Sequence, residues 1–207
     1  MNEVIPGVFH WQARHPRTGG QAHSHLLVEA RTVLDPMAPP EAVELMRANP
    51  PERIVLSNRH HYREAGRIVE EFACPVLCPE SGTYDFDGDD DRDVEPYAYG
   101  DRLAPSLIAH EVGSICPDDA ALELRSGPGA LAFADGLMRH DGRLHFVSDG
   151  LLADDPGEVE NVKRGLVSSL RRLCELDFDT LLFAHGDPLA EGGRAALEEF
   201  VEAHTPG

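Results

Sequence analysis

Short apolar runs alternate with amphipathic segments along this chain, and the alternation predicts strands and helices in turn. Residues 4–11 favour a short strand with a turn, and residues 25–35 favour two strands joined at Glu29-Ala30-Arg31. Pro39-Pro40 marks the start of a helix, whose apolar residues recur at helical spacing. The predicted elements that follow are this helix over 41–49, a strand over 53–57, a helix over 63–73 and a strand over 74–79.

The second half of the chain repeats this order of strands and then helices. Its clearest helix covers residues 156–175, because Asp155 can cap it, Pro156 suits its first turn and an apolar stripe follows. The other predicted elements are strands within 105–124, 129–137 and 145–147, a strand over 180–184 and a final helix over 194–203.

Two β-rich stretches, each followed by helices, favour two stacked sheets with helices on the outer faces, since each sheet must cover both of its apolar faces. The 207 residues are enough for one such unit, and no linker is long enough to separate two. We therefore expect an α/β protein with one domain over 1–207.

Composition narrows the classes of partner. Apolar residues make up 42% of the chain, as in globular proteins, and no apolar run approaches the length of a membrane span. Thirty-seven acidic and 18 basic side chains give a formal charge of −19, which repels nucleic acid and anionic membranes. No signal peptide is visible, and the four cysteines lack paired spacing, so we expect a cytoplasmic location with reduced thiols. We expect a small-molecule substrate or ligand as the partner, and the sequence leaves the oligomeric state open.

Potential metal ligands or acid/base groups follow three of the predicted strands. His60-His61 lies where a strand runs into a helix, Asp135 closes the strand before Gly136, and His185 closes another before Gly186. Parallel α/β proteins place their ligands at such strand ends. These side chains are therefore predicted to share one site.

The order of these landmarks resembles the metallo-β-lactamase fold superfamily. Val33-Leu34-Asp35 is similar to the aspartate that ends the family's first hairpin, and residues 58–63 are similar to its HxHxDH motif. Asp135 is similar to its bridging aspartate, and His185-Gly186 to its last histidine. The resemblance covers most of the chain and implies a four-layer αββα sandwich of two mixed sheets.

The motif departs from the family pattern at several positions. In the HxHxDH register only the second histidine is kept, as His60, while Asn58, Tyr62 and Arg63 replace the other three residues. Gly113-Ser114 stands where the family has Gly-His. The resemblance therefore leaves His60, Asp135 and His185 as catalytic and metal-binding candidates.

Two interpretations of this incomplete motif remain open. One divalent ion (zinc, manganese or iron) binds at His60, Asp135 and His185, supplemented by His61 or His110. In the other interpretation no metal binds, and the fixed charge of Arg63 replaces an ion and pairs with Asp135. His23-Ser24-His25 has the spacing of a strand pair facing one side, and we interpret it as a surface or rim feature, because nothing marks a third ligand.

The two interpretations imply different functions. With a metal, the resemblance implies a hydrolase acting on an ester, thioester, amide or phosphate, although Tyr62 stands where the family has a carboxylate. Without one, the chain is a non-catalytic member of the fold that binds a small anion through Arg63, Tyr62 and Asn58. A metal-free structural subunit is a third interpretation.

Overall fold

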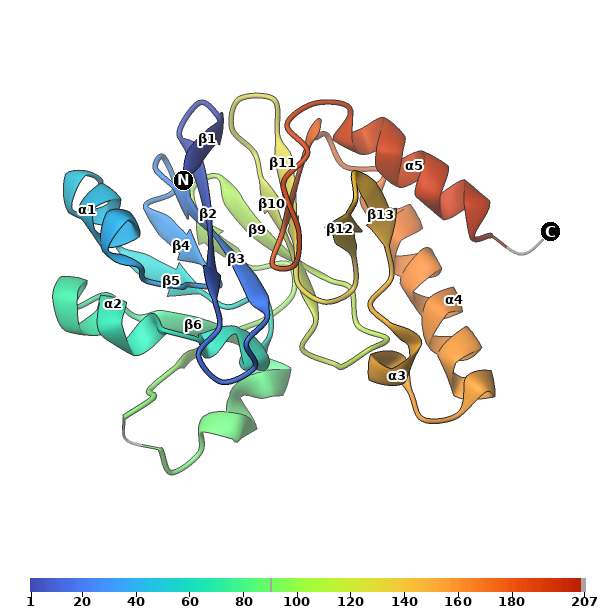
Figure 1. Cartoon of the computed structure of the whole chain (residues 1–207), viewed down its shortest axis with the longest axis horizontal. Coiled ribbons are helices and arrows are strands. Elements are labelled where there is room, and N and C mark those ends of the chain that lie inside the picture. The colour runs from blue at the N-terminus through green and yellow to red at the C-terminus, as the bar shows by residue number, and fades with distance from the viewer. Residues whose placement is uncertain (90, 206–207) are drawn as a thin grey trace.

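The computed structural model describes residues 1–89 and 91–205. Two β-sheets face each other, and helices cover the outer face of each (Figure 1). This is the four-layer αββα sandwich that the resemblance implies. In the part of the chain that is described, no helix is both long and apolar enough to cross a membrane.

The first sheet has antiparallel strands at one side and parallel strands at the other. Its order is β1 (Asn2–Ile5), β2 (Val8–Arg14), β3 (Gln21–Leu27), β4 (Thr32–Leu34), β5 (Arg53–Val55), β6 (Val76–Pro79) and β7 (Glu95–Tyr97). Strands β1 to β4 are antiparallel neighbours and β4 to β7 are parallel neighbours. The two strands predicted within 25–35 are the β3–β4 hairpin, with its turn at the expected place.

The outer face of the first sheet packs against two helices, α1 (Pro40–Ala48) and α2 (Ala65–Phe72). Each helix buries a narrow apolar stripe, which includes Met46 in α1 and Ile68 in α2. A 3₁₀ turn, η1 (Arg59–Tyr62), separates β5 from α2, so α2 begins two residues later than predicted. A second such turn, η2 (Glu80–Phe86), follows β6.

The second sheet has the order β14 (Thr180–Phe183), β11 (Ala130–Phe133), β10 (Ala120–Leu124), β9 (Leu107–Glu111) and β8 (Arg102–Ala104). β11 and β14 are parallel, and the other neighbours are antiparallel. A separate hairpin joins β12 (Met138–His140) to β13 (Arg143–His145), and the short helix α3 covers Asp149–Leu152.

Two helices, α4 (Pro156–Leu173) and α5 (Gly193–Ala203), cover the second sheet and bury its outer side chains. As predicted, Asp155 caps α4, and its side chain accepts hydrogen bonds from the backbone N–H groups of Gly157 and Glu158.

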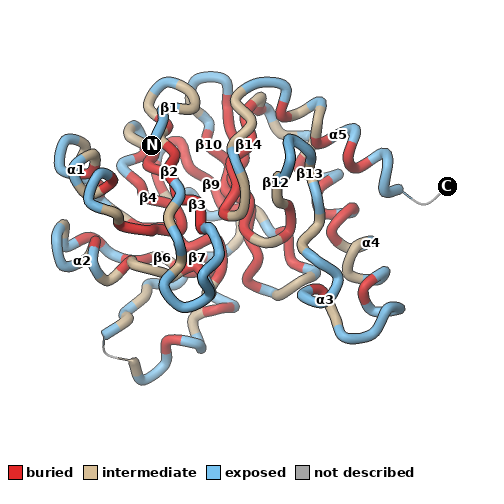
Figure 2. Tube along the Cα trace, in the orientation of Figure 1, coloured by how far each residue is buried: buried red, intermediate tan, exposed pale blue. Residues whose placement is uncertain are grey.

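Between the sheets lies a continuous apolar layer, whose residues are among the buried segments that Figure 2 shows in red. At one edge this layer gives way to polar residues, where β4, β5, β11 and β14 all end. Backbone hydrogen bonds join the sheets at this edge, from His23 N to Ala184 O and from Ala120 N to Ser57 O. The fold therefore brings the strand ends singled out in the sequence to one place.

Candidate metal centre

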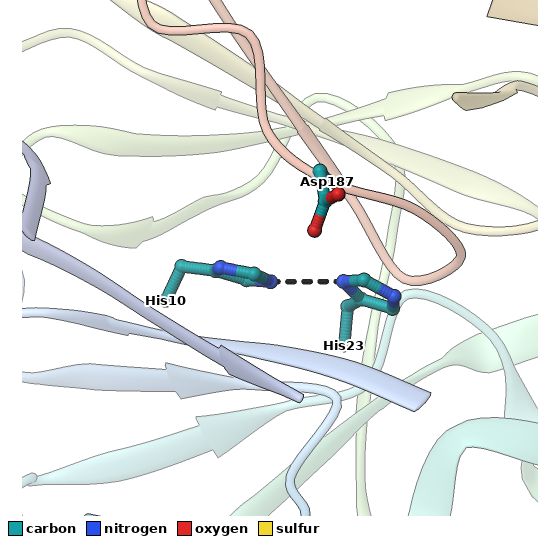
Figure 3. Close-up of side chains that lie close together, drawn as sticks. All are labelled: His10, His23 and Asp187. Atoms are coloured by element: carbon teal, nitrogen blue, oxygen red, sulfur yellow. Dashed lines mark hydrogen bonds between the residues drawn. The ribbon is translucent and has the colours of Figure 1, made fainter. Parts of the chain in front are cut away.

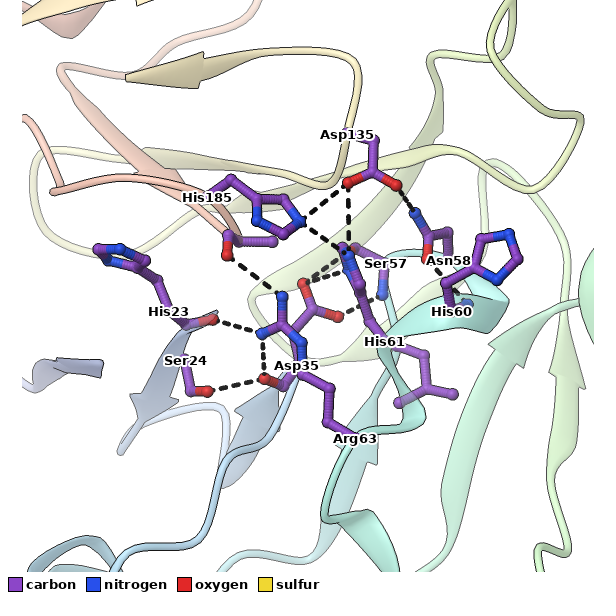
Figure 4. Close-up of polar contacts among 12 residues, drawn as sticks. His23, Ser24, Asp35, Ser57, Asn58, His60, His61, Arg63, Asp135 and His185 are labelled. Carbon is purple, nitrogen blue, oxygen red and sulfur yellow. Dashed lines mark hydrogen bonds and ion pairs between the residues drawn. The ribbon is translucent and has the colours of Figure 1, made fainter. Parts of the chain in front are cut away.

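Three side chains converge where β5, β11 and β14 end: His61, Asp135 and His185 (Figure 4). His185 Nε2 lies 3.0 Å from Asp135 Oδ1 and 3.3 Å from His61 Nε2. His61 Nε2 lies 3.5 Å from the same carboxylate oxygen. Two imidazole nitrogens and one carboxylate oxygen therefore face a common point.

Contacts on the far side of the His61 ring fix its orientation. His61 Nδ1 lies 3.2 Å from Asp35 Oδ2 and 3.0 Å from Ser57 Oγ, so Nε2 is the nitrogen that faces Asp135 and His185. Asp35 Oδ1 also accepts a hydrogen bond from Ser57 N at 2.8 Å. Ser57, His61 and Asp35 are residue types of a hydrolytic triad, but Ser57 is only 1% exposed, so it positions His61 and is not reachable as a nucleophile.

Asp135 is held in a similar way by groups around it. Its Oδ2 accepts a 2.7 Å hydrogen bond from Asn58 Nδ2, which leaves Oδ1 to face the two imidazoles. The backbone N–H of Asp135 donates to Asp119 Oδ1. Asn58 was a predicted ligand-binding residue, and in the structure its side chain positions Asp135.

Arg63 lies beneath the cluster and joins the two sheets. Its Nη1 donates to the backbone oxygens of His23 and Asp35, each at 2.7 Å, and its Nη2 donates to Ala184 O at 3.2 Å. None of these contacts is to the Asp135 carboxylate, with which the sequence interpretation paired it. The guanidinium therefore serves the scaffold with these donors.

Charged neighbours and burial shift the pKa values of several side chains in the site. Burial and Arg63 lower the pKa of His61, but the carboxylates of Asp35 and Asp135 outweigh them and raise it to about 9. Burial favours the neutral form of Asp135, yet His61 and His185 hold its pKa well below the ordinary value. Asp119, by contrast, is buried near Asp135, and burial raises its pKa well above the ordinary value.

The geometry of the three facing atoms fits a metal ion. Atoms bound tetrahedrally to zinc at its usual bond lengths lie about 3.3 Å from one another. The separations here are 3.0, 3.3 and 3.5 Å. The contact between His61 and Asp35 has the form that orients metal-binding histidines in proteins, in which a carboxylate accepts from the other ring nitrogen.

The structure places His61, and not its neighbour His60, at the centre of the site. Both residues lie in the 3₁₀ turn η1, which is kinked at His61, where the backbone has φ of −93° and ψ of 18°. His61 is 4% exposed and faces the cluster, whereas His60 is exposed and points away from it (Figure 4). Of the two adjacent candidates, the structure brings His61 into the cluster and leaves His60 outside it.

Two other candidates lie apart from the cluster. Tyr62 packs against Phe86, with ring centroids 5.6 Å apart, in the layer under α2. His110, on β9, contacts Glu123 Oε2 at 2.8 Å, on the sheet face that carries α4 and α5. Neither Tyr62 nor His110 therefore contributes to the cluster of His61, Asp135 and His185.

A second group of potential ligands, which no sequence pattern predicted, contains His10, His23 and Asp187. His10, His23 and His25 are buried, so the interpretation of His23 and His25 as surface residues is wrong, although His23 does lie at the edge of a groove. Burial lowers the pKa of His10 and lowers that of His23 to about 4. The only signal in the sequence was the alternation His23-Ser24-His25, because the partners lie on other elements.

A groove of about 460 Å³ connects the two groups. His185 lines it from the first group, and His23 and Asp187 line it from the second. The remaining lining residues are Gln12, Gln21, Met138, Arg139, His140, Asp141, Gly142 and Gly186.

No protein-family model matches the sequence, and no curated protein sequence matches it. Solved structures, in contrast, do match this chain. A metallo-β-lactamase family protein from Thermus thermophilus is 18% identical, with a TM-score of 0.64 over 98% of this chain and 80% of that one. A β-lactamase domain protein from Burkholderia ambifaria is 16% identical, with a TM-score of 0.66 over 98% and 75%.

A third similar structure is that of TTHA1623 in a di-iron-bound form, which is 18% identical, with a TM-score of 0.60 over 92% of this chain and 93% of that one. Identities this low establish the arrangement of the backbone and not the chemistry. The layered sheets, the strand order and these structural matches together show that the chain has the metallo-β-lactamase fold.

Proposed function

We propose that the protein is a metal-dependent hydrolase of small molecules, with one divalent ion held by His61, Asp135 and His185. The observation that carries this proposal is the set of separations among the three ligand atoms, 3.0 to 3.5 Å, which suits a transition-metal ion. The di-iron-bound form of TTHA1623 supports it from a similar fold. When bound, such an ion activates water and polarises a carbonyl or phosphoryl oxygen.

The surrounding residues prepare the site for that ion. Asp35 and Ser57 aim His61 Nε2 at the cluster, and Asn58 turns one oxygen of Asp135 toward the two imidazoles. His185 lines the groove, so a substrate that enters the groove reaches this edge of the cluster. The ester, thioester, amide and phosphate classes all remain candidates for the substrate.

The charge of the scaffold also suits this role. Asp35 and Asp135 supply two negative charges, and the buried guanidinium of Arg63 supplies one positive charge. A divalent ion with neutral imidazoles brings the sum to +1, which favours a bound anion such as hydroxide or an anionic substrate group.

The metal-free alternative has less support in the geometry. In that interpretation Arg63 binds a small anion, but its guanidinium donates to three backbone carbonyls and is not among the residues that line the groove. Tyr62, which was expected beside it, packs against Phe86.

Metal analysis of protein purified without added metal tests the proposal, because the chain offers a matched pair of histidines. His61→Ala should lose about one equivalent of metal per chain, whereas His60→Ala should retain it. Esters, thioesters, amides and phosphodiesters should then be screened with and without a chelator.

Hydrolysis that a chelator abolishes, that added metal restores and that His61→Ala lacks is the expected result. Equal metal content in His61→Ala and the unchanged protein would reject the metal centre. A metal-loaded protein that hydrolyses none of the four classes would reject the hydrolase and leave the fold as a binding module.

A further inference from the structure

Two imidazoles meet between the sheets at a place that the proposed active site does not use. His10 on β2 and His23 on β3 both face the layer between the sheets, and His10 Nε2 lies 2.9 Å from His23 Nδ1. Their rings are stacked, with centroids 5.1 Å apart. At this distance one ring donates an N–H hydrogen bond to the other, or, when both nitrogens are deprotonated, their lone pairs face a common ion.

The neighbours of His10 fix which of its nitrogens is free to bind. Asn2 Oδ1 lies 3.2 Å from His10 Nδ1, so this nitrogen donates a hydrogen and the lone pair lies on Nε2, toward His23. The ring of His25 packs against His10 with centroids 5.2 Å apart. A hydrogen bond to the far nitrogen and packing of the ring are the devices that orient metal-binding histidines.

Asp187 supplies a carboxylate to this pair from a different part of the chain. One of its oxygens lies within 4.8 Å of a ring nitrogen of each histidine, and its side chain points toward the gap between the two rings (Figure 3). Asp187 is exposed at the rim of the groove, whereas His10 and His23 are buried. The arrangement is therefore closed on the sheet side and open on the groove side.

Backbone geometry holds Asp187 in this place. Gly186 has φ of +122°, and a Cβ at this position would lie 1.9 Å from Arg139 O, so the segment 185–187 lies tightly against β12. This segment carries His185 to the first cluster and Asp187 to the second.

We infer that His10, His23 and Asp187 form a second metal site, which takes a transition-metal ion of the zinc type and opens on the same groove as the proposed active site. The two imidazoles and one carboxylate favour Zn²⁺, Co²⁺, Ni²⁺ or Cu²⁺ over Mg²⁺ and Ca²⁺, which prefer oxygen ligands. Three protein ligands leave a coordination position for water or for an anionic group of a molecule in the groove. The site is independent of His61 and Asp135, and so does not rest on the hydrolase proposal.

Zinc titration by calorimetry of the chelator-treated full chain tests this inference. The unchanged protein should bind two equivalents per chain. Asp187→Asn, an exposed change that leaves the buried imidazoles in place, should weaken one of the two sites by at least about 10-fold. His23→Ala should remove that site, and His140→Ala, a groove histidine outside both clusters, should retain both.

The variant His61→Ala separates the two metal sites. This variant lacks a ligand of the proposed active site and should still bind one equivalent of zinc at the second site. The double variant His23→Ala/His61→Ala should bind no zinc at either site. The inference fails if His61→Ala binds no zinc, or if Asp187→Asn and His23→Ala give the same isotherm as the unchanged protein. In either case the unchanged protein can still bind zinc at His61, Asp135 and His185. These results would therefore reject the second metal site without rejecting the proposed hydrolase.

Discussion

At the scale of single residues, the orientation of one imidazole decides whether the cluster can bind an ion. Asp35 sets this orientation, because its Oδ2 lies 3.2 Å from His61 Nδ1. Burial alone would raise the pKa of Asp35, but His61 and Arg63 lower it, so the group is a carboxylate that accepts hydrogen bonds.

Changing Asp35 to Asn tests this role without removing a ligand. Asp35 has φ of +47°, a backbone conformation that Asn tolerates well, so the fold should persist. The amide is a weaker acceptor for the imidazole N–H, and the zinc affinity of the first cluster should fall about 10- to 100-fold. A chelator competition assay measures the affinity.

Asp141→Asn is the matched control, since Asp141 lines the groove with a side chain that is 88% exposed. It should leave the affinity unchanged. If Asp35→Asn binds zinc as tightly as Asp141→Asn does, the positioning role of Asp35 is disproved.

Glu123 gives a second residue-scale prediction, away from both clusters. Burial raises its pKa, but hydrogen bonds from Arg125 and His110 outweigh burial and lower it. An acid with a lowered pKa in the folded state stabilises the fold above its ordinary pKa, and this contribution is lost as the pH falls through the lowered value.

Glu123→Gln should therefore reduce the free energy of unfolding by about 1–2 kcal/mol at pH 7, and the difference should shrink as the pH falls below about 4. Urea unfolding at several pH values measures it. Glu111→Gln, at an exposed position on the neighbouring strand, should change little. If the loss of unfolding free energy in Glu123→Gln stays constant down to low pH, this explanation is wrong.

The position of the site could be predicted from the sequence, but not every side chain in it. Asp135 and His185 follow apolar strands, and strand ends can be read from periodicity. His60 and His61 lie in an irregular turn, where no period indicates which residue faces inward. The second cluster comes from three separate segments, and only their pairing in space reveals it.

At the scale of elements, the predictions for long amphipathic segments were confirmed, and irregular segments differed. The expected helix 156–175 is α4 (Pro156–Leu173), and the expected strand 180–184 is β14 (Thr180–Phe183). The predicted strand region 105–124 contains the separate strands β9 and β10 with a loop between them. That loop contributes Asp119, whose contact with Asp135 depends on tertiary structure.

The connection after β14 yields an element-scale prediction. Gly186→Ala should destabilise the fold by about 3 kcal/mol, because the added methyl group would meet the backbone of Arg139 at a positive φ. Zinc binding at both clusters should weaken as well. Thermal unfolding and zinc titration measure the two effects.

Gly142→Ala is the control for the backbone conformation alone. Gly142 also has a positive φ, of +78°, but a Cβ there meets no atom within 4 Å. Gly142→Ala should reduce the free energy of unfolding by about 1 kcal/mol and should leave both metal sites intact. Equal costs for the two changes would show that close packing of the 185–187 segment is unimportant.

At the scale of the whole molecule, the first cluster bridges the two sheets. His61 follows β5 of the first sheet, whereas Asp135 and His185 follow β11 and β14 of the second. An ion bound only by the folded chain should stabilise it by about 2.7 kcal/mol at 100 times its dissociation constant. This corresponds to a rise of about 5–10 °C in Tm for a chain of this size.

Thermal unfolding in zinc and in chelator measures this effect in an Asp187→Asn background, which limits the contribution of the second cluster. His60→Ala in that background should show the same rise, and His61→Ala should show almost none. A rise that persists in His61→Ala would place the stabilising ion elsewhere.

The charge of −19 belongs to this scale too. It favours the accumulation of divalent cations near the surface and disfavours nucleic acid and anionic membranes. The expected small-molecule partner, the cytoplasmic location and the single domain over 1–207 stay predictions from the sequence.

The three residues 185–187 have a consequence for how the two centres fill. His185 contributes to one and Asp187 to the other, with the constrained Gly186 between them. An ion bound at either centre restrains this segment, so less conformational entropy is lost when an ion binds at the other centre. Binding of the two ions should therefore be positively cooperative. Thermodynamic reciprocity then requires each ion to raise the affinity for its companion by the same factor.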